Sequence, residues 1–186
     1  MFNSTLLQAL TLATWQTIYM VFISSFVSIA LGLVVGTLLF ASRSGGILAN
    51  KTLNRVLGVI VNITRSVPYV ILMIAIIPLT RFLVGTSIGT NAAIVSLTLA
   101  AIPFYARIVE NALSDLPAGL VEAALAMAAT PFQTIWKALI PEALPALISG
   151  GTLTIISLIG YSAMAGAVGG GGLGELAVQY GYERFN

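Results

Sequence analysis

The sequence predicts an all-α protein, a polytopic bundle of transmembrane helices, and three observations predict this. Hydrophobic residues make up 58% of the chain and charged residues only 8%, whereas a soluble domain carries about 25% charged residues. The mean hydropathy is +1.02. Four separate stretches approach the roughly 20 mostly apolar residues that a helical span needs. We therefore interpret 1–186 as a single transmembrane domain.

The first span is predicted over 15–40, a stretch without a charged residue. Trp15 and Tyr19 lie near one end of it, where aromatic side chains suit the membrane interface. Gly32 and Gly36 within the span form the pattern G-x-x-x-G. This spacing permits a close helix–helix contact, although glycine is common in spans and the spacing also arises by chance.

Three further spans are predicted over 57–79, 91–106 and 143–168. A basic polar loop, 43–55, precedes the second span, and a short loop, 81–90, follows it. The helix of the third span is expected to continue beyond the lipid, because Arg107 and Glu110 are spaced to pair along a helix. A glycine-rich stretch, 166–174, ends the fourth span.

The distribution of lysine and arginine predicts an N-terminus outside the cell. In that orientation five cations lie on the cytoplasmic side, namely Arg43, Lys51, Arg55, Arg107 and Lys137. Only Arg81 and Arg184 then face outward. This bias agrees with the positive-inside rule, and it places the segment 115–141 in the cytoplasm.

The segment 115–141 carries helix signals but is not apolar enough to span a bilayer. Asp115 is a candidate N-cap for a first helix that reaches about Ala128. A second helix is predicted from a capping-box pattern, Thr130 followed by Gln133. The prediction is a short helix–turn–helix between two spans.

The second of these helices is amphipathic, and Pro141 is expected to end it. Its apolar residues fall on one face, namely Phe132, Ile135, Trp136 and Leu139. Two interpretations remain open. The pair of helices lies flat among the headgroups with Trp136 and Lys137 as anchors, or it inserts into a groove on a cytoplasmic partner.

The same segment resembles the EAA coupling motif of ABC importer permeases. Four residues match this motif outright: Glu122, Ala123, Ala124 and Pro141. Ala128 stands where the motif usually has glycine. Because alanine resists a left-handed turn by roughly 1–2 kcal/mol, the turn is expected at 129–131 instead. The resemblance implies that Glu122 and the face of Phe132 and Trp136 anchor an ATPase.

Stretches along nearly the whole chain resemble one subfamily, the methionine importer permeases. They are 62–68, 78–81, 84–89, 106–113, 128–131, 139–145, 160–164 and the glycine-rich tail through 179–182. The resemblance implies a five-span permease of the bacterial inner membrane that translocates L- or D-methionine. A fifth span is then expected after Asn186, so that the chain is interpreted as truncated at its C-terminus.

The same resemblance implies a set of partners. They are a second copy of the permease, a cytoplasmic ABC ATPase and a periplasmic substrate-binding lipoprotein. ATP and Mg²⁺ are expected on the ATPase, because this chain has no G-x-x-x-x-G-K-[ST] motif. The permease itself is expected to hold no cofactor and to be no enzyme. A permease for another amino acid or small solute is the alternative.

Five residues are candidates for a translocation path or gate: Arg65, Ser157, Tyr161, Ser162 and Met164. Charges within spans are functional candidates, yet Arg65 lies near enough to one end to snorkel to the surface. The hydroxyls of the fourth span could line a path or bond to the backbone one turn back. Met164 could plug a gate or serve plain packing.

Several other functions are excluded or disfavoured. The chain has no His and no Cys, so that no catalytic or metal-binding residue is predicted and the G-x-S-x-G pattern at 85–89 cannot complete a triad. A net charge of +2 is too small to suggest nucleic acid. The rival class is a secondary carrier or a helical membrane scaffold. No acidic residue falls mid-span, which disfavours a proton-coupled carrier.

Overall fold

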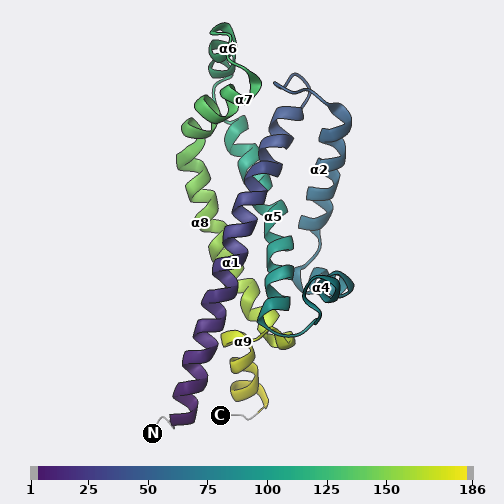
Figure 1. The fold of residues 1–186 in the computed structure, drawn as a ribbon, viewed down its shortest axis with the longest axis vertical. Coiled ribbons are helices and arrows are strands. Elements are labelled where there is room, and N and C mark those ends of the chain that lie inside the picture. Colours follow the sequence, from purple (N-terminus) through teal and green to yellow (C-terminus); the bar gives the residue numbers. More distant parts are fainter. Residues whose placement is uncertain (1–3, 184–186) are drawn as a thin grey trace. The chain divides into compact units, whose positions relative to one another are not determined.

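The computed structural model describes residues 4–183, and every regular element in that range is helical (Figure 1). The long helices are α1 (Ser4–Ser42), α5 (Thr90–Ser114) and α8 (Ile140–Ala165). Between α1 and α5 the chain forms α2 (Lys51–Ser66), α3 (Tyr69–Ala75) and α4 (Ile77–Val84). Between α5 and α8 it forms α6 (Ala118–Ala126), α7 (Pro131–Gln133) and the π-helical segment η1 (Thr134–Leu139). The last elements are η2 (Gly166–Gly170), α9 (Gly172–Ala177) and η3 (Val178–Glu183).

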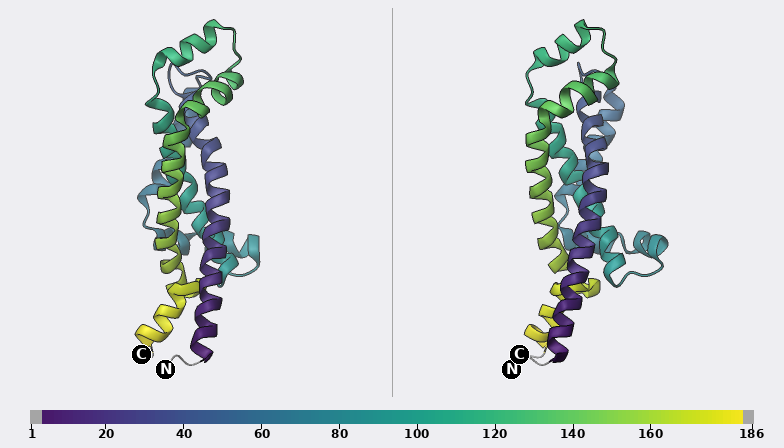
Figure 2. Two further views of the ribbon diagram at one scale, coloured as in Figure 1. Left: turned by 90° about the vertical axis from the view of Figure 1, so that its left-hand side faces the viewer. Right: turned by 60° about the vertical axis from the view of Figure 1, so that its left-hand side comes forward.

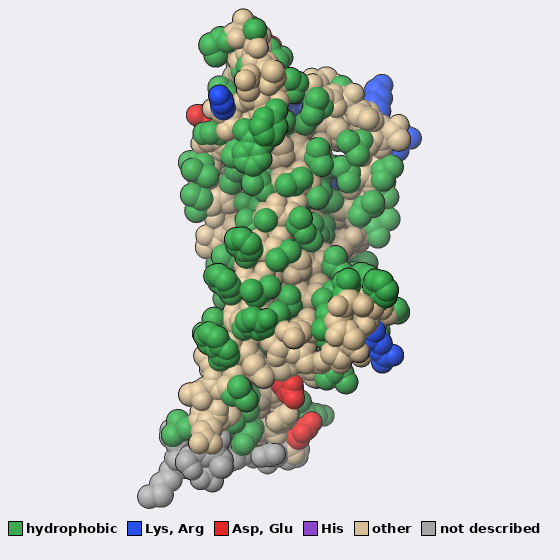
Figure 3. All heavy atoms as spheres, in the orientation of Figure 1, with side chains coloured by type: hydrophobic (Ala, Val, Ile, Leu, Met, Phe, Trp, Pro, Cys, Tyr) green, Lys and Arg blue, Asp and Glu red, His purple; other side chains and the backbone are tan. Residues whose placement is uncertain are grey.

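Three helical stretches are long and apolar enough to cross a membrane. They are Leu6–Ser42, Thr90–Ser114 and Pro131–Gly170, and they confirm the first, third and fourth predicted spans. Hydrophobic side chains cover the face shown in Figure 3, with few charged side chains among them. An exposed apolar surface of this extent is typical of a membrane interface or of an interface with another protein.

The second predicted span is not one helix. The chain bends by 112° between α2 and α3, so the pair forms either a broken span or a re-entrant loop. Pro68 causes the break, because it has no N–H to donate and it pushes Val67 out of the helical region. The backbone of Pro68 is extended, with φ −55° and ψ 139°. The described chain therefore has three spans, or four if the bent pair counts as one.

The chain folds into two compact units, each built from segments that are distant in sequence. The first unit comprises the described parts of 1–28, 67–101 and 155–186, and the second comprises 29–66 and 102–154. Each of α1, α5 and α8 contributes residues to both units. Arg81, which was expected in a loop, lies on α4 in the first unit, and Arg184 lies outside the described residues.

The core of the first unit contains a pair of stacked tyrosines. The rings of Tyr69 and Tyr161 lie 4.8 Å apart between centroids and nearly parallel, at 6°. The hydroxyl of Tyr69 is 2.9 Å from Oγ of Ser96. Fully buried Met20, Leu97 and Leu158 belong to the same cluster. The tyrosine hydroxyl can be buried here because it has a hydrogen-bond partner.

The glycine-rich stretch of the first unit is tied to α1 by two side chains. The N–H of Gly172 donates to Oε1 of Gln16 at 2.9 Å, and the N–H of Leu173 donates to Oγ1 of Thr17 at 2.9 Å. These N–H groups lie at the start of α9, where they have no partner within the helix. Gly171 has a φ of +80°, which glycine adopts without strain.

The core of the second unit forms where α1 packs against α5. A Cβ on Gly36 would overlap the carbonyl oxygen of Ala106 and lie 2.6 Å from Cβ of Val109. A Cβ on Gly32 would lie 3.0 Å from the carbonyl oxygen of Ile102. The G-x-x-x-G pattern is therefore a true close-packing surface, which confirms the first of its two interpretations.

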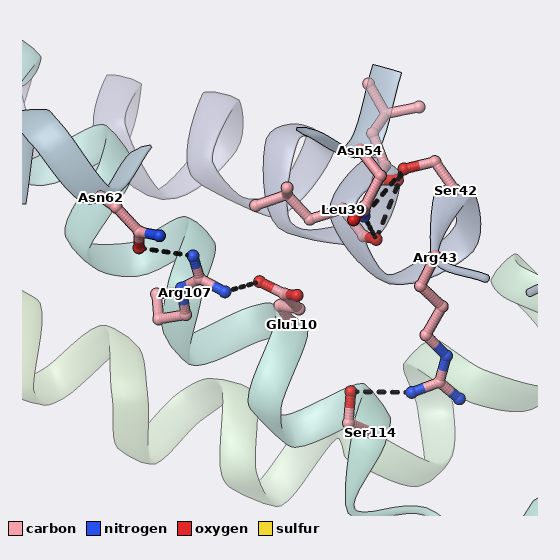
Figure 4. Close-up of polar contacts among 9 residues, drawn as sticks. Leu39, Ser42, Arg43, Asn54, Asn62, Arg107, Glu110 and Ser114 are labelled. Atoms are coloured by element: carbon pink, nitrogen blue, oxygen red, sulfur yellow. Dashed lines mark hydrogen bonds and ion pairs between the residues drawn. The ribbon is translucent and has the colours of Figure 1, made fainter. Parts of the chain in front are cut away.

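Polar side chains attach α2 to this core (Figure 4). Nδ2 of Asn54 donates to the carbonyl oxygen of Leu39 at 2.8 Å. Nη2 of Arg107 donates to Oδ1 of Asn62 at 2.7 Å, while its Nη1 pairs with Glu110 at 2.6 Å. The predicted pairing of Arg107 with Glu110 is confirmed. Arg107 also links α5 to α2, because its guanidinium contacts Asn62 as well as Glu110.

Candidate functional site

The candidate site is the hairpin, which we define as residues 115–141 of the second unit. Figure 2 shows it as two short helical segments folded against each other beyond the ends of α5 and α8. The predicted helix–turn–helix is present. Its first helix is α6, and its second begins at α7 and runs on through η1.

The first helix starts later than predicted. It begins at Ala118 with Pro117 at the N-cap position and no side-chain cap, so Asp115 is not the cap. The N–H of Asp115 instead bonds to the carbonyl of Asn111 and extends the end of α5. A proline N-cap is workable, because the missing N–H would have had no partner in the first turn.

The side chains of α6 divide into a buried and an exposed set. Ala124 is 5% exposed, and the neighbouring Leu120 and Val121 pack against the core of the second unit. Glu122 and Ala123 are exposed. Of the Glu-Ala-Ala motif, therefore, two residues are available to a partner and the third holds α6 on the unit.

The turn after α6 is left-handed at Ala128, whose φ is +58°. The N–H of Ala129 bonds to the carbonyl of Ala124 at 3.1 Å, and the N–H of Ala128 bonds to that of Leu125 at 2.9 Å. These two bonds define a Schellman motif, in which this position is usually glycine. The expectation that 129–131 makes the turn instead is wrong. The two bonds to carbonyls at the end of α6 outweigh the strain of one alanine.

Replacing Ala128 by glycine is expected to stabilise the protein by about 1 kcal/mol, because it removes the left-handed strain at a smaller cost in chain entropy. Thermal unfolding in detergent measures this. The matched control is Ala126→Gly, inside α6, which should destabilise the protein by about 1 kcal/mol. Equal losses at both positions would contradict the strain assigned to Ala128.

The second helix begins as predicted. The N–H of Gln133 donates to Oγ1 of Thr130 at 3.3 Å, and Oε1 of Gln133 accepts from the N–H of Thr130 at 3.0 Å. This reciprocal pair is a capping box, with Pro131 at the first helical position. The prediction from the Thr130–Gln133 spacing is confirmed.

Pro141 does not end this helix, contrary to the prediction. Helical backbone continues from Pro131 through η1 into α8, which contains Pro141. The segment immediately before Pro141 is π-helical, over Thr134–Leu139. A π turn is wider than an α turn, so it accommodates a residue that has no N–H and whose ring would crowd the preceding turn. The second helix of the hairpin is thus continuous with the start of α8.

The aromatic face of the second helix lines a groove that we call the hairpin groove. Its walls are Leu33, Val34, Thr37, Leu38 and Leu48 on one side and Thr130, Pro131, Phe132, Ile135 and Trp136 on the other. Its volume is about 540 Å³. Phe132 and Trp136 are 69% and 47% exposed, with ring centroids 6.0 Å apart.

The residues considered for a translocation path lie on two helices, α2 and α8. Arg65 lies exposed in the last turn of α2, just before the break at Pro68, and belongs to the second unit. The other four lie on α8 in the first unit. Ser162 is buried and donates to the carbonyl of Ile159 at 2.7 Å, the back-bonded alternative. Tyr161 stacks on Tyr69, Ser157 is half-buried, and Met164 is 48% exposed.

Two sets of residues in the second unit were not predicted from the sequence: those that attach α2 to its core, and those of α1 that line the hairpin groove. Asn54 and Asn62 attach α2 through side-chain amides. Asn54 falls in the predicted polar loop 43–55, and Asn62 falls in the predicted span 57–79. Their signal was available, because an asparagine in an apolar helix needs a hydrogen-bond partner. The contribution of Leu33 and Val34 to the hairpin groove had no signal, since an apolar residue of a span looks the same whatever covers it.

Among residues 4–183 no group of three or more His, Cys, Asp or Glu side chains comes together to hold a metal ion. The carboxylates of the hairpin do not converge. Glu122 is exposed on α6, and Glu142 is exposed in the first turn of α8. What the hairpin offers is a contact surface and no reaction centre.

The long apolar helices and the hairpin between two of them define a polytopic helical membrane protein with an interaction element outside its spans. Residues 28–185 match the family described as binding-protein-dependent transport system inner membrane component. This chain belongs to that family.

Individual relatives are similar over most of the chain. It is 56% identical over 174 residues to a probable D-methionine transport system permease protein MetI of Vibrio cholerae, covering 94% of this chain and 77% of the relative. It is 55% identical over 152 residues to the D-methionine transport system permease protein MetI of Escherichia coli K12, covering 82% and 70%. The chain thus spans about three quarters of the length of these relatives.

Solved structures agree with the fold. A chain of the MetNI methionine ABC transporter in an inward-facing conformation is 52% identical, with a TM-score of 0.95 over 99% of this chain and 85% of that one. A chain of an amino acid ABC transporter is 16% identical with a TM-score of 0.78. At that identity, the second likeness concerns the fold alone.

Proposed function

We propose that this chain is the membrane-spanning permease subunit of an ATP-driven ABC importer that moves methionine into the cytoplasm. The observation that carries the proposal is the TM-score of 0.95 at 52% identity to a chain of the MetNI methionine ABC transporter. The permease acts as a homodimer. It works with a separate cytoplasmic ATPase that binds ATP and Mg²⁺, and with a periplasmic lipoprotein that delivers the substrate.

In this proposal the hairpin transmits the motion of the ATPase to the spans. Glu122 and Ala123 on α6, together with the turn at Ala128, form the surface that contacts the ATPase, because their side chains are exposed. The exposed Phe132, Trp136 and Pro141 belong to the same coupling surface. The buried Ala124 holds this surface on the second unit. Since α7, η1 and α8 follow one another without a break, a displacement of the hairpin is transmitted to the start of α8.

A cytoplasmic hairpin requires the N-terminus to lie outside. The distribution of charge supports this orientation, because the five cations assigned to the cytoplasm all belong to the second unit, as the hairpin does. The chain has no native cysteine, so Gly119→Cys on α6 is a clean reporter. An impermeant maleimide added outside intact cells should leave this cysteine unlabelled; labelling without lysis would place the hairpin in the wrong compartment.

Reversing the charge of Glu122 is expected to separate the permease from its ATPase. In Glu122→Arg, ATPase co-purification and uptake of labelled methionine should each fall at least tenfold, because a contact of about 1.4 kcal/mol or more is lost. The amount of permease in the membrane should not change, since the side chain is exposed. Unchanged binding and uptake would contradict the assigned role.

The matched control is Glu183→Arg, the same change at an exposed glutamate of the first unit outside the hairpin. It should leave ATPase co-purification intact. Substrate is tested separately, by competing methionine uptake with L-methionine, D-methionine and a panel of other amino acids. Failure of both methionines to compete, with intact ATPase binding, would indicate a permease for a different solute.

A further inference from the structure

The beginning of α2 carries a pocket that we call the basic pocket. All of its lining residues belong to the second unit, namely Ser44, Lys51, Thr52, Asn54, Arg55 and Val56. Its volume is about 560 Å³. Lys51 and Arg55 are exposed and lie one helical turn apart. Two cations and two hydroxyls are groups that bind the oxygens of a phosphate.

The two cations of the basic pocket have no carboxylate partner among residues 4–183. The sequence contains no acidic residue before Glu110. Within the described part of the chain, the one ion pair joins Arg107 to Glu110. The positive-inside rule explains why cations lie in this part of the chain, but it does not require that they share a pocket with hydroxyls. Since a basic cluster without acidic neighbours attracts anions, the pocket favours a negatively charged occupant.

An exposed apolar stripe runs from this pocket along the same helix. Its members lie at positions i, i+3, i+4 and i+7 and therefore share one face of α2; they are Val56, Val59, Ile60 and Ile63. Their side chains are 50–61% exposed. Figure 3 shows basic side chains near the start of α2 and hydrophobic side chains farther along it. Because Val56 also lines the basic pocket, the pocket and the stripe are continuous.

These two features together restrict the occupant, which must join a negative charge to an apolar body. A second copy that paired symmetrically through its own α2 would place cations against cations, because Lys51, Arg55 and Arg65 are the only charged residues of that helix. A small anion has no apolar part. An anionic phospholipid combines both chemical features in one molecule, and lipid surrounds every membrane-spanning protein.

We propose that the basic pocket binds the phosphate of an anionic phospholipid, with an acyl chain of the same lipid along the stripe. Lys51 and Arg55 pair with the phosphate oxygens, and the hydroxyls of Ser44 and Thr52 donate hydrogen bonds to them. Basic clusters on membrane proteins recognise anionic headgroups through such contacts. The inference needs only a membrane-spanning chain, so it stands apart from the choice of substrate and ATPase.

Lipid binding to the purified full chain tests the proposal. The chain is titrated in a nonionic detergent with phosphatidylglycerol, or with phosphatidylcholine that has the same acyl chains, and native mass spectrometry measures the bound lipid. Phosphatidylglycerol should bind at least tenfold more tightly, because each cation near an anionic headgroup contributes roughly a fivefold effect. Inorganic phosphate at the same concentration should not displace the lipid, because it gains nothing from the stripe.

Charge variants tie this preference to the basic pocket. The double variant Lys51→Gln, Arg55→Gln should reduce the preference for phosphatidylglycerol at least fivefold. The matched control is Arg81→Gln, Lys137→Gln, which removes two exposed cations outside the pocket. It should leave the preference unchanged. Both side chains replaced in the first variant are exposed, so its thermal unfolding should match that of the wild type.

A polar substitution tests the contribution of the stripe. Ile60 is 55% exposed on the stripe, and Ile60→Gln should weaken the binding of phosphatidylglycerol by about threefold or more, because an apolar contact with the acyl chain is lost. The matched control is Ile156→Gln, at an isoleucine of α8 that is 59% exposed. This second change should leave the binding of phosphatidylglycerol unaltered.

Three results would overturn the proposal. Equal affinity for the two lipids would mean that the basic pocket does not select an anionic headgroup and that solvent or protein covers it. Displacement by inorganic phosphate would make a small anion the occupant. An equal loss of preference in both charge variants would assign the effect to net charge and not to the pocket.

Discussion

Replacing Gly36 by alanine is expected to cost about 3 kcal/mol of folding stability, the upper end of what overpacking usually costs. The added methyl group would overlap the backbone carbonyl oxygen of Ala106 and lie 2.6 Å from Cβ of Val109. A backbone atom cannot swing aside as the tip of a flexible side chain can. The helices α1 and α5 would have to separate, and their separation would open the core around Val109 and Leu113.

Gly58→Ala is the matched control for this prediction. Gly58 also lies within a helix, α2, but a Cβ added there would meet nothing within 4 Å. Alanine should therefore stabilise the protein at this position by about 0.5–1 kcal/mol through helix propensity. Denaturant or thermal unfolding in detergent measures both. If the two variants shift stability in the same direction, the G-x-x-x-G surface is not the contact described.

Replacing Arg107 by methionine is expected to cost about 2–3 kcal/mol. The change leaves the carboxylate of Glu110, whose side chain is only 19% exposed, without its partner at 2.6 Å. Breaking a buried ion pair from one side costs 3–5 kcal/mol, and residual exposure of both side chains reduces this. The same change removes the hydrogen bond to Asn62, so α2 should also loosen.

The double variant Arg107→Met, Glu110→Leu is the decisive comparison. With no charge left unpaired, its stability should return to within about 1 kcal/mol of the wild type. A double-mutant cycle of unfolding free energies measures the interaction between the two positions. Additive losses would mean that the pair does not stabilise the protein and that each side chain acts through other contacts.

The spans and the caps could be predicted because their signals are local. The length of an uncharged run such as 15–40 can be compared directly with the number of helical residues that a bilayer requires. The capping box at Thr130 and Gln133 depends on two residues three positions apart, and the structure confirms it. The pairing of Arg107 with Glu110 depends on one turn of helix and is confirmed as well.

Whether a given proline ends a helix could not be predicted from the sequence. Pro68 breaks a helix by 112°, whereas Pro141 lies inside a continuous helical stretch behind a π turn. The residue is the same in both cases. What differs is the local backbone, which is extended at Pro68 and forms a π turn ahead of Pro141. Ala128 illustrates the same principle, since hydrogen bonds to the end of α6 hold an alanine in a conformation that it resists.

The sequence by itself determined that this protein is a helical membrane protein, where three of its apolar spans lie and where the second helix of the hairpin begins. These properties follow from hydropathy and from hydrogen bonds within one turn of the chain. Only the tertiary structure decided that Gly36 touches α5, that Arg107 reaches α2 and that Trp136 shares a groove with α1. Each of these contacts joins residues distant in sequence, and the free energy that selects them arises only when the helices pack.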